Sequence, residues 1–317
     1  MKIAYMILAH AEPKQLHRLV NALSNGENHF FIHINKNVEI TPFEEELKGV
    51  DNIHFASVRY RVRWGGYSQT LGKLIMLEDA CSCGLQFDRF VYLSGADYPI
   101  MSNKQMEKLY AHDPDKQYIA AYNLSSGTAG GDNQLWKLNI KWYFDSPFKS
   151  TLPHRIYKRI PKLVRQIENK VGIYKDVHWK SVDGEKKDIF FGCDFFSITG
   201  ECGRFLLKEY KRQVYLQRYL KTAFCSLELF AQTIIFNSEF RDESLIFNTT
   251  NLEDLSPSHY FVLNDGDRVV PMTISNFDEL INSGKLFFRK VDTKSSSELL
   301  DKLDAYRREK DREIVNA

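Results

Sequence analysis

Residues 2–9, KIAYMILA, decide the fold of this chain, because a short apolar run of this length is typical of a strand buried on both faces of a parallel sheet. Leu16, Leu19, Val20 and Leu23 then follow at helical spacing. The same alternation continues, with further strands predicted at 29–35, 52–58 and 89–93 and a second helix at 69–83. Strands that alternate with helices in this way predict an α/β fold built on a parallel sheet.

Polar residues follow the ends of three of these predicted strands. His10 comes directly after the first strand, Asn35 ends the second, and Asp97 lies just beyond the fourth, within LSGADYPI at 93–100. Open α/β sheets bind ligands beyond the carboxyl ends of their strands. We therefore expect these three side chains to line one crevice.

The bulk composition limits the class of protein. The chain has 317 residues, of which 43% are hydrophobic and 26% charged, so we expect a globular protein with a large core. Its length permits two small domains or one large α/β domain with an insertion, and we favour the second. The formal net charge of +2 gives no support for nucleic-acid binding. The five cysteines form neither a disulfide set nor a zinc spacing, so we expect reduced thiols.

Two features concern the cellular location. The first residues lack the apolar region and cleavage site of a secretory leader, and no apolar run reaches the roughly 18 residues that span a bilayer. We therefore expect a cytoplasmic protein, or one that lies peripherally at the inner face of the cytoplasmic membrane. Residues 154–170 interleave cations with apolar side chains. This pattern fits either a solvated basic surface or a contact with an anionic lipid or a polyanionic glycan.

The second half of the chain contains three further predicted elements. Residues 188–199 form an apolar and aromatic strand that includes FFGCDFF at 190–196. A helix is predicted from Ser226 to about Asn237, and a charged terminal helix over 297–312.

Several motifs together resemble one family of enzymes. They are ILAH at 7–10, FIHINK at 31–36, RWGGYS at 63–68, LSGADYPI at 93–100, FGCDFF at 191–196, ELFAQT at 228–233 and LFFRK at 286–290. In order and spacing they resemble the core-2/I-branching β-1,6-N-acetylglucosaminyltransferase and xylosyltransferase family, glycosyltransferase family 14, in a bacterial-type member. The resemblance covers residues 1–292.

The resemblance implies a GT-A-like fold with a Rossmann-like nucleotide-binding half and a mixed central sheet. We expect one domain over 1–292, with the donor-nucleotide half at about 1–122 and the acceptor half and phosphate-binding end at about 123–292. Residues 293–317 would form a charged C-terminal helix. The implied reaction is inverting transfer of a sugar, N-acetylglucosamine or xylose, from a UDP-sugar to a hydroxyl of a glycan or lipid-linked saccharide. β-1,6 branching is the expected linkage, and no cofactor is expected.

The departing nucleotide needs positive charge, which a divalent metal or fixed cations can supply. Metal-using GT-A enzymes place Asp-X-Asp after the fourth strand, where this chain has only Asp97. The adjacent Arg289 and Lys290 could stabilise the pyrophosphate instead, and the resemblance assigns a basic pair in the matching motif to this task in metal-independent enzymes. It also places Arg268 near a further phosphate-contacting arginine. Surface cations without a function are the alternative in each case.

Inverting transfer also needs a general base that removes the proton of the acceptor hydroxyl. The resemblance places Glu228 at the position of the family's catalytic glutamate, although Ser226 and Leu227 replace its usual Pro-Asp neighbours. Glu228 could instead have only a structural role, in which its negative charge interacts favourably with the helix dipole, since it lies in the first turn of a helix. Asp194 is the second candidate for the catalytic carboxylate.

The remaining predicted donor site takes its residues from the same motifs. Asn35 replaces an aspartate that family members direct at the nucleoside, and an amide can still accept a hydrogen bond from a ribose hydroxyl, without the strength of a charged acceptor. His10, Trp64, Ser94 and Asp97 complete this predicted set of nucleotide-binding residues.

Two rival functions remain open at this point. Asp265-Gly266-Asp267 could be a metal motif, although Asp-Gly is more typical of a hairpin turn. A metal site there would favour a metal-dependent nucleotidyltransferase. The replacements at Asn35 and at Ser226 and Leu227 would also suit a non-catalytic protein that binds a glycan or a nucleotide sugar.

Overall fold

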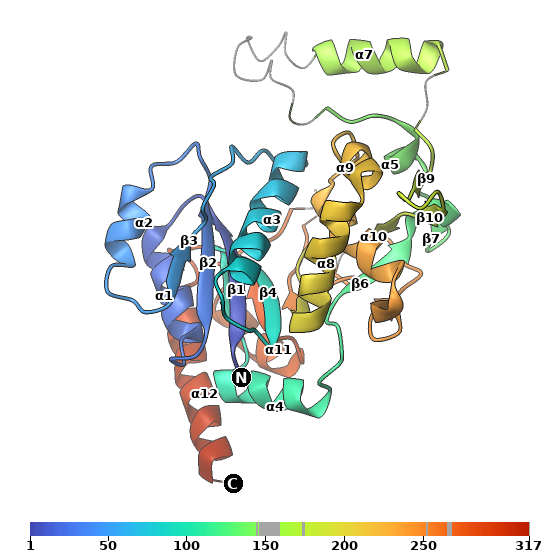
Figure 1. The fold of residues 1–317 in the computed structure, drawn as a ribbon. Coiled ribbons are helices and arrows are strands. Elements are labelled where there is room, and N and C mark those ends of the chain that lie inside the picture. The colour runs from blue at the N-terminus through green and yellow to red at the C-terminus, as the bar shows by residue number, and fades with distance from the viewer. Residues whose placement is uncertain (144, 146–158, 173–174, 252, 265–267, 317) are drawn as a thin grey trace.

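A five-stranded sheet forms the centre of the protein, seen in a computed structural model that describes residues 1–143, 145, 159–172, 175–251, 253–264 and 268–316 (Figure 1). The strand order is β12-β4-β1-β2-β3. Four strands are parallel, and β12 (Ser197–Thr199) is antiparallel to its neighbour. The parallel strands are β1 (Ile3–Ala9), β2 (His29–Ile34), β3 (Ile53–Phe55) and β4 (Arg89–Ser94). The predicted α/β fold with a mixed central sheet is confirmed.

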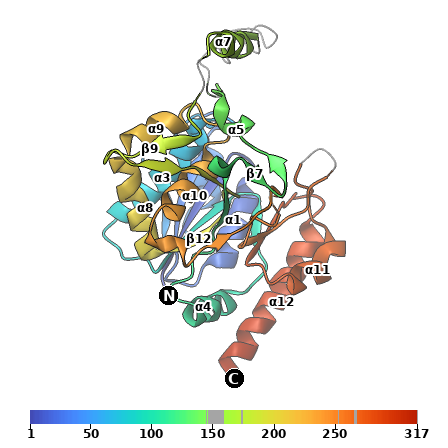
Figure 2. The same ribbon diagram turned by 90° about the vertical axis from the view of Figure 1, so that its right-hand side faces the viewer.

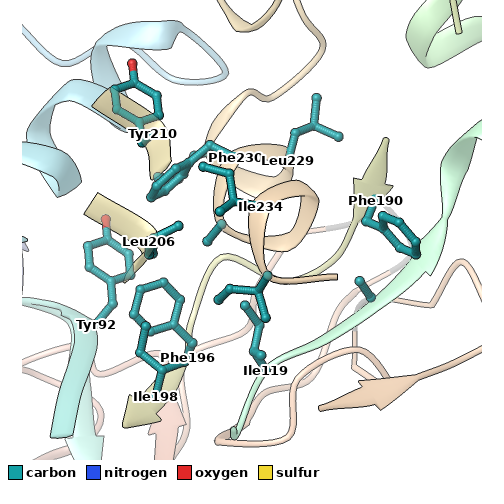
Figure 3. Packing of buried hydrophobic residues seen from close by; sticks show 14 of the residues in the cluster. Tyr92, Ile119, Phe190, Phe196, Ile198, Leu206, Tyr210, Leu229, Phe230 and Ile234 are labelled. Carbon is teal, nitrogen blue, oxygen red and sulfur yellow. The ribbon is translucent and has the colours of Figure 1, made fainter. Parts of the chain in front are cut away.

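Helices cover both faces of this sheet (Figures 1 and 2). One apolar core joins the sheet to α1 (Pro13–Leu23) and α12 (Ser297–Asn316). The second core joins it to α3 (Tyr67–Ser82), α8 (Gly200–Arg212) and α10 (Leu227–Phe236), with the packing shown in Figure 3. The other helices are α2 (Thr41–Glu46), α4 (Asn103–His112), α5 (Trp136–Asn139), α7 (Arg159–Lys170), α9 (Val214–Leu220) and α11 (Phe277–Asn282).

Smaller sheets extend the fold around the central one. The strand order in one of them is β14-β15-β5, and this sheet pairs Arg289 near the chain's end with Asp97. A second has the order β11-β6-β13. Their strands are β5 (Asp97–Pro99), β6 (Ala120–Asn123), β11 (Phe190–Phe191), β13 (Leu245–Ile246), β14 (His259–Tyr260) and β15 (Phe287–Arg289). Two hairpins comprise β7 (Thr128–Ala129) with β8 (Asp132–Asn133), and β9 (His178–Lys180) with β10 (Lys186–Asp188).

The prediction of a single strand over residues 188–199 is wrong. The structure divides it into β11, which pairs with β6, and β12, which pairs with β4 in the central sheet. Gly192 lies where the chain leaves β11, and a Cβ atom there would stand 2.1 Å from the carbonyl oxygen of Ala120. The close approach of two backbones therefore requires glycine, and residues 192–196 cross between two sheets with Asp194 in the crossing.

The C-terminal helix is longer than the predicted 297–312 and is well packed. It buries Leu299, Leu300 and Leu303, and its Asp304 accepts hydrogen bonds from Arg18 and Tyr98 at 2.7 Å each. None of the described helices combines the length and the apolar character that a bilayer crossing needs. All five cysteines carry free thiols, as expected.

Candidate active site

A pocket of about 530 Å³ opens at the carboxyl ends of β1, β2 and β4. This volume is within the range of small-molecule sites, and its position is the one at which open α/β sheets bind ligands. A hollow of about 600 Å³ lies at the other end of β4, lined by Asp88, Arg89 and Glu201 among others. We take the first as the candidate site, because it gathers residues from motifs far apart in the sequence. Seven of the predicted site residues line it: His10, Asn35, Trp64, Ser94, Asp194, Glu228 and Arg289.

The other three predicted site residues are not part of the described lining. Asp97 is fully buried behind the pocket wall. Arg268 and Lys290 are exposed. Arg268 directly precedes Val269 in the chain and Lys290 directly follows Arg289, and both Val269 and Arg289 line the pocket. Direct contact of these three residues with a donor stays a prediction.

Asp97 organises one wall of the pocket. Its carboxylate accepts hydrogen bonds from the Ser94 hydroxyl at 2.8 Å and from the Arg289 guanidinium at 3.1 Å. The buried His259 ring approaches the same carboxylate, with Nε2 at 3.5 Å. Burial by itself would raise the pKa of Asp97, but the Arg289 charge and His259 hold that pKa below its ordinary value. Asp97 is therefore a buried anion that holds Ser94 and Arg289 at the pocket surface.

The amide of Asn35 is already engaged by the protein. Its nitrogen donates to the backbone carbonyl of Val62 at 3.1 Å, and its oxygen accepts from the backbone N–H of Asn37 at 3.1 Å and of Val62 at 3.3 Å. A carboxylate cannot donate to a carbonyl. The asparagine thus has a structural reason to be here, because it ties the end of β2 to the loop that leads to Trp64.

Trp64 stands at the pocket rim, with 74% of its surface exposed. The following Gly65 has φ of +70°, a left-handed conformation that favours glycine. A Cβ atom on Gly66 would lie 2.3 Å from Oδ1 of the Asp145 carboxylate, and the other oxygen of that carboxylate accepts a hydrogen bond from the backbone N–H of Ser68 at 2.7 Å. These contacts shape the start of α3 and set the position of Trp64.

Glu228 lies in the first turn of α10 and faces the pocket. The hydroxyl of Ser226 at the start of this helix lies 2.9 Å from that of Thr70 on α3. The backbone N–H of Gly192 donates to the Glu228 carbonyl at 3.1 Å. These bonds join α10, α3 and the crossing segment that contains Asp194, and so bring both candidate carboxylates into one pocket.

The electrostatics of the site distinguish Glu228 from an ordinary surface acid. Burial, followed by the nearby negative charge of Asp194, raises the pKa of Glu228 to about 8, against the opposing effects of Lys137 and Lys73. Burial also lowers the pKa of Lys137, which donates to the Tyr122 hydroxyl at 3.0 Å and lies over the Phe191 ring. A carboxylate with a pKa near neutrality is suited to general-base catalysis.

Sequence reasoning missed several residues of the site. Tyr92, Phe261, Leu263 and Val269 line the pocket, and a strand-like apolar pattern carries no sign of this role. Lys137 lay in a segment without a recognisable motif. Among the residues that the structure describes, no group of three or more histidines, cysteines and acids could hold a metal. The predicted alternative at Asp265-Gly266-Asp267 lies outside the described residues.

Comparisons with known proteins find similarity to one family over the first part of the chain. Residues 3–141 match the family model of the Core-2/I-Branching enzyme. Human xylosyltransferase 2 is 29% identical over 126 residues, which are 38% of this chain and 15% of that protein. Xylosyltransferase sqv-6 of Caenorhabditis elegans is 23% identical over 253 residues, 78% of this chain and 28% of that protein. The chain thus spans well under a third of the length of either relative.

Two solved structures match the chain at low sequence identity and with TM-scores below 0.5. A galactosyltransferase, LgtC, in complex with donor and acceptor sugar analogs has a TM-score of 0.39 and 12% identity, with 96% of each chain covered. A 4-diphosphocytidyl-2C-methyl-D-erythritol synthase from Anaerococcus prevotii has a TM-score of 0.35 and 12% identity, with 80% of this chain and 92% of that chain covered.

Proposed function

We propose that the chain is a glycosyltransferase of the core-2/I-branching enzyme family, whose model it matches over residues 3–141, and that it moves a sugar from a UDP-sugar to a glycan hydroxyl. The observation that carries this proposal is the pairing of Glu228 and Asp194 in one pocket with a fixed cation, Arg289. A base for the acceptor and a positive charge for the leaving group are the two requirements of the reaction.

In the proposed mechanism, Glu228 removes the proton from the acceptor hydroxyl. The hydroxyl oxygen then forms a bond to the anomeric carbon as the bond from that carbon to UDP breaks, and the configuration inverts. Asp194 orients the acceptor beside Glu228. Burial makes Glu228 a stronger base than an exposed carboxylate, because its ionised form is poorly solvated.

In the proposed reaction, negative charge develops on the leaving UDP next to the pocket wall formed by Arg289 and Ser94. Asp97 keeps the Arg289 guanidinium in place, so little reorganisation is needed when charge develops on the phosphate. Lys290 and Arg268 would add charge at the mouth of the pocket. With these cations we propose that transfer needs no divalent metal.

For the donor we propose UDP-N-acetylglucosamine, with UDP-xylose as the other candidate, and for the product a β-1,6 branch on a glycan or lipid-linked saccharide. The xylosyltransferase relatives support the second donor, and the resemblance of the motifs to the core-2/I-branching β-1,6-N-acetylglucosaminyltransferases supports the first. The exposed Trp64 ring offers a surface on which a sugar or base could stack.

The test is to incubate the protein with each UDP-sugar, an acceptor mixture and EDTA, and to measure UDP release and glycan mass. Transfer in EDTA supports the proposal. A metal-dependent nucleotidyltransferase would instead release pyrophosphate only with added metal. A binding protein would retain UDP-sugar affinity without releasing UDP.

We also propose that the protein acts in the cytoplasm and contacts the inner face of the membrane through residues 154–170, of which 154–158 lie outside the described residues and 159–170 form α7. Leu163, Ile167 and Val171 are 57%, 54% and 62% exposed on or directly after this helix. Glu168 faces the body of the protein through Lys141 and Tyr143. Figure 1 shows α7 standing apart from the central layers. Sedimentation with vesicles of anionic lipid and with vesicles of neutral lipid tests this contact. If the protein sediments with neither kind of vesicle, the proposed contact is refuted.

A further inference from the structure

A buried cation lies next to the candidate carboxylates. Lys73 on α3 is completely inaccessible to solvent, and its Nζ donates a hydrogen bond to the backbone carbonyl of Asp194. Lysine is almost never fully buried unless a partner compensates its charge, because desolvation of an ammonium group is costly. The position of Lys73 therefore calls for a physical reason.

Aromatic rings compensate part of this cost. Nζ lies 3.7 Å from the ring centroid of Tyr92, 4.3 Å from that of Phe196 and 5.7 Å from that of Phe230. These three rings converge from β4, the strand region after Asp194 and α10 in the core shown in Figure 3. Ring faces attract a desolvated cation, so this cage favours the charged form of Lys73.

The same region connects the segment that contains Asp194 to the helix that contains Glu228. Gln232 on α10 donates to the Cys193 carbonyl at 2.6 Å, next to the Asp194 carbonyl that Lys73 binds. Two neighbouring carbonyls of the crossing segment are thus held from α10 and from α3. Since Glu228 also lies on α10, these contacts set where Asp194 stands relative to it.

We propose that Lys73 is a positioning residue, which fixes the Asp194 backbone and supplies a positive charge that keeps Glu228 available as a base. This inference rests on the proposed glycosyltransferase function. Lys73 contacts no solvent and so touches no substrate; it acts through the two carboxylates.

Several groups besides Lys73 act on Glu228. Asp194 in the crossing segment, Lys137 on α5 and Tyr122 on β6 face it, together with the thiols of Cys193 and Cys225. Burial lowers the pKa of Lys73 to about 7, while Asp194, Cys193 and Glu228 oppose that shift. Lys73 is therefore largely charged below pH 7, and it loses that charge over the lower part of the pH range in which Glu228 titrates.

Two variants separate charge from packing. Lys73→Met fills the cage without charge, and replacement of a buried ion by an apolar group of similar size is often neutral or stabilising. Lys73→Gln keeps a donor for the Asp194 carbonyl but no charge. The first measurement is the pKa of Glu228 by carbon-13 carboxyl titration, with the signal identified by its loss in Glu228→Gln.

We expect this pKa to rise in both variants, by less than about one unit, because Lys73 carries its charge in only part of the pH range in which Glu228 titrates. The acid limb of the kcat/KM profile should shift upward with it, with a loss of roughly two- to fivefold at pH 7. An unchanged pKa in a folded variant would overturn the proposal, as would an equal loss of rate at every pH. If Lys73→Met does not fold, Lys73→Gln decides. The titration needs no turnover, so a wild-type protein without transferase activity would refute the proposed function and leave this test intact.

Discussion

The pH dependence of transfer provides the sharpest test of Glu228 as the base. With a pKa of about 8, about one tenth of the Glu228 carboxylates are ionised at pH 7 and about half at pH 8. We therefore expect kcat/KM to rise about tenfold per pH unit below pH 7 and to level off above pH 8. Glu228→Gln should lower transfer by about a hundred- to ten-thousand-fold and leave UDP affinity within a few-fold. The assay is UDP release at saturating and at low donor from pH 5.5 to 9.5, with UDP affinity measured by calorimetry.

Asp194→Asn is the matched control. Removal of the Asp194 charge should lower the pKa of Glu228 and move the acid limb to lower pH, because that charge contributes to the raised pKa. If Asp194→Asn abolishes transfer while Glu228→Gln retains it, the assignment of the base passes to Asp194. A profile that is flat between pH 6 and 9 would refute the argument for a buried base altogether.

The same shift predicts a change in stability with a definite sign. The folded protein binds the Glu228 proton more tightly than the unfolded chain, whose glutamate has the ordinary value of 4.5. The contribution of this proton to the free energy of unfolding is fully present below about pH 4.5 and is lost as pH rises through about 8. Relative to wild type, the Tm of Glu228→Gln should therefore increase from pH 5 to pH 9. A pure helix-dipole role predicts a lower Tm for the variant instead, by removal of about 0.3 to 1 kcal/mol.

Three further predictions concern the surroundings of Glu228. Arg289→Ala should weaken UDP binding in calorimetry by about tenfold or more, since a charge-assisted hydrogen bond contributes about 1.5 to 3 kcal/mol. Lys290→Ala should weaken UDP binding less, because Lys290 is exposed; equal losses of affinity in the two variants would contradict the placing of the phosphate site at Arg289. Asn35→Asp should lower the free energy of unfolding by about 1 to 3 kcal/mol, because a carboxylate would face a backbone carbonyl; an unchanged Tm with tighter UDP binding would refute the structural role. Gly66→Ala should lower Tm and transfer because its Cβ would clash with the Asp145 carboxylate, while Gly72→Ala, with no contact under 3.5 Å, serves as the tolerated control.

The sequence by itself determined the class of the fold and the end of the sheet at which the pocket forms. Apolar runs and helical spacings are local patterns, and they predicted the parallel strands and the helix over Tyr67–Ser82 closely. Because the carboxyl ends of parallel strands share one edge, His10, Asn35 and Asp97 were expected to line one crevice; His10 and Asn35 line it, whereas Asp97 is fully buried and is not among the lining residues. The motif match added Glu228, Asp194 and Arg289, which no local pattern could have brought together.

The tertiary structure decided what each of these side chains does. Asp97 was predicted as a donor-binding residue from its place after a strand, and only the tertiary structure shows that packing buries it against Arg289, which is 192 positions away in the chain. The Asn35 amide donates a hydrogen bond to a backbone carbonyl of the loop that leads to Trp64. The predicted strand at 188–199 is divided into two strands, because Gly192 packs against the backbone of another strand. Lys73 belongs to a helix, and three aromatic rings from distant segments enclose its ammonium group. Such outcomes depend on contacts between residues far apart in sequence, and desolvation and charge compensation at those contacts have no counterpart in any local pattern.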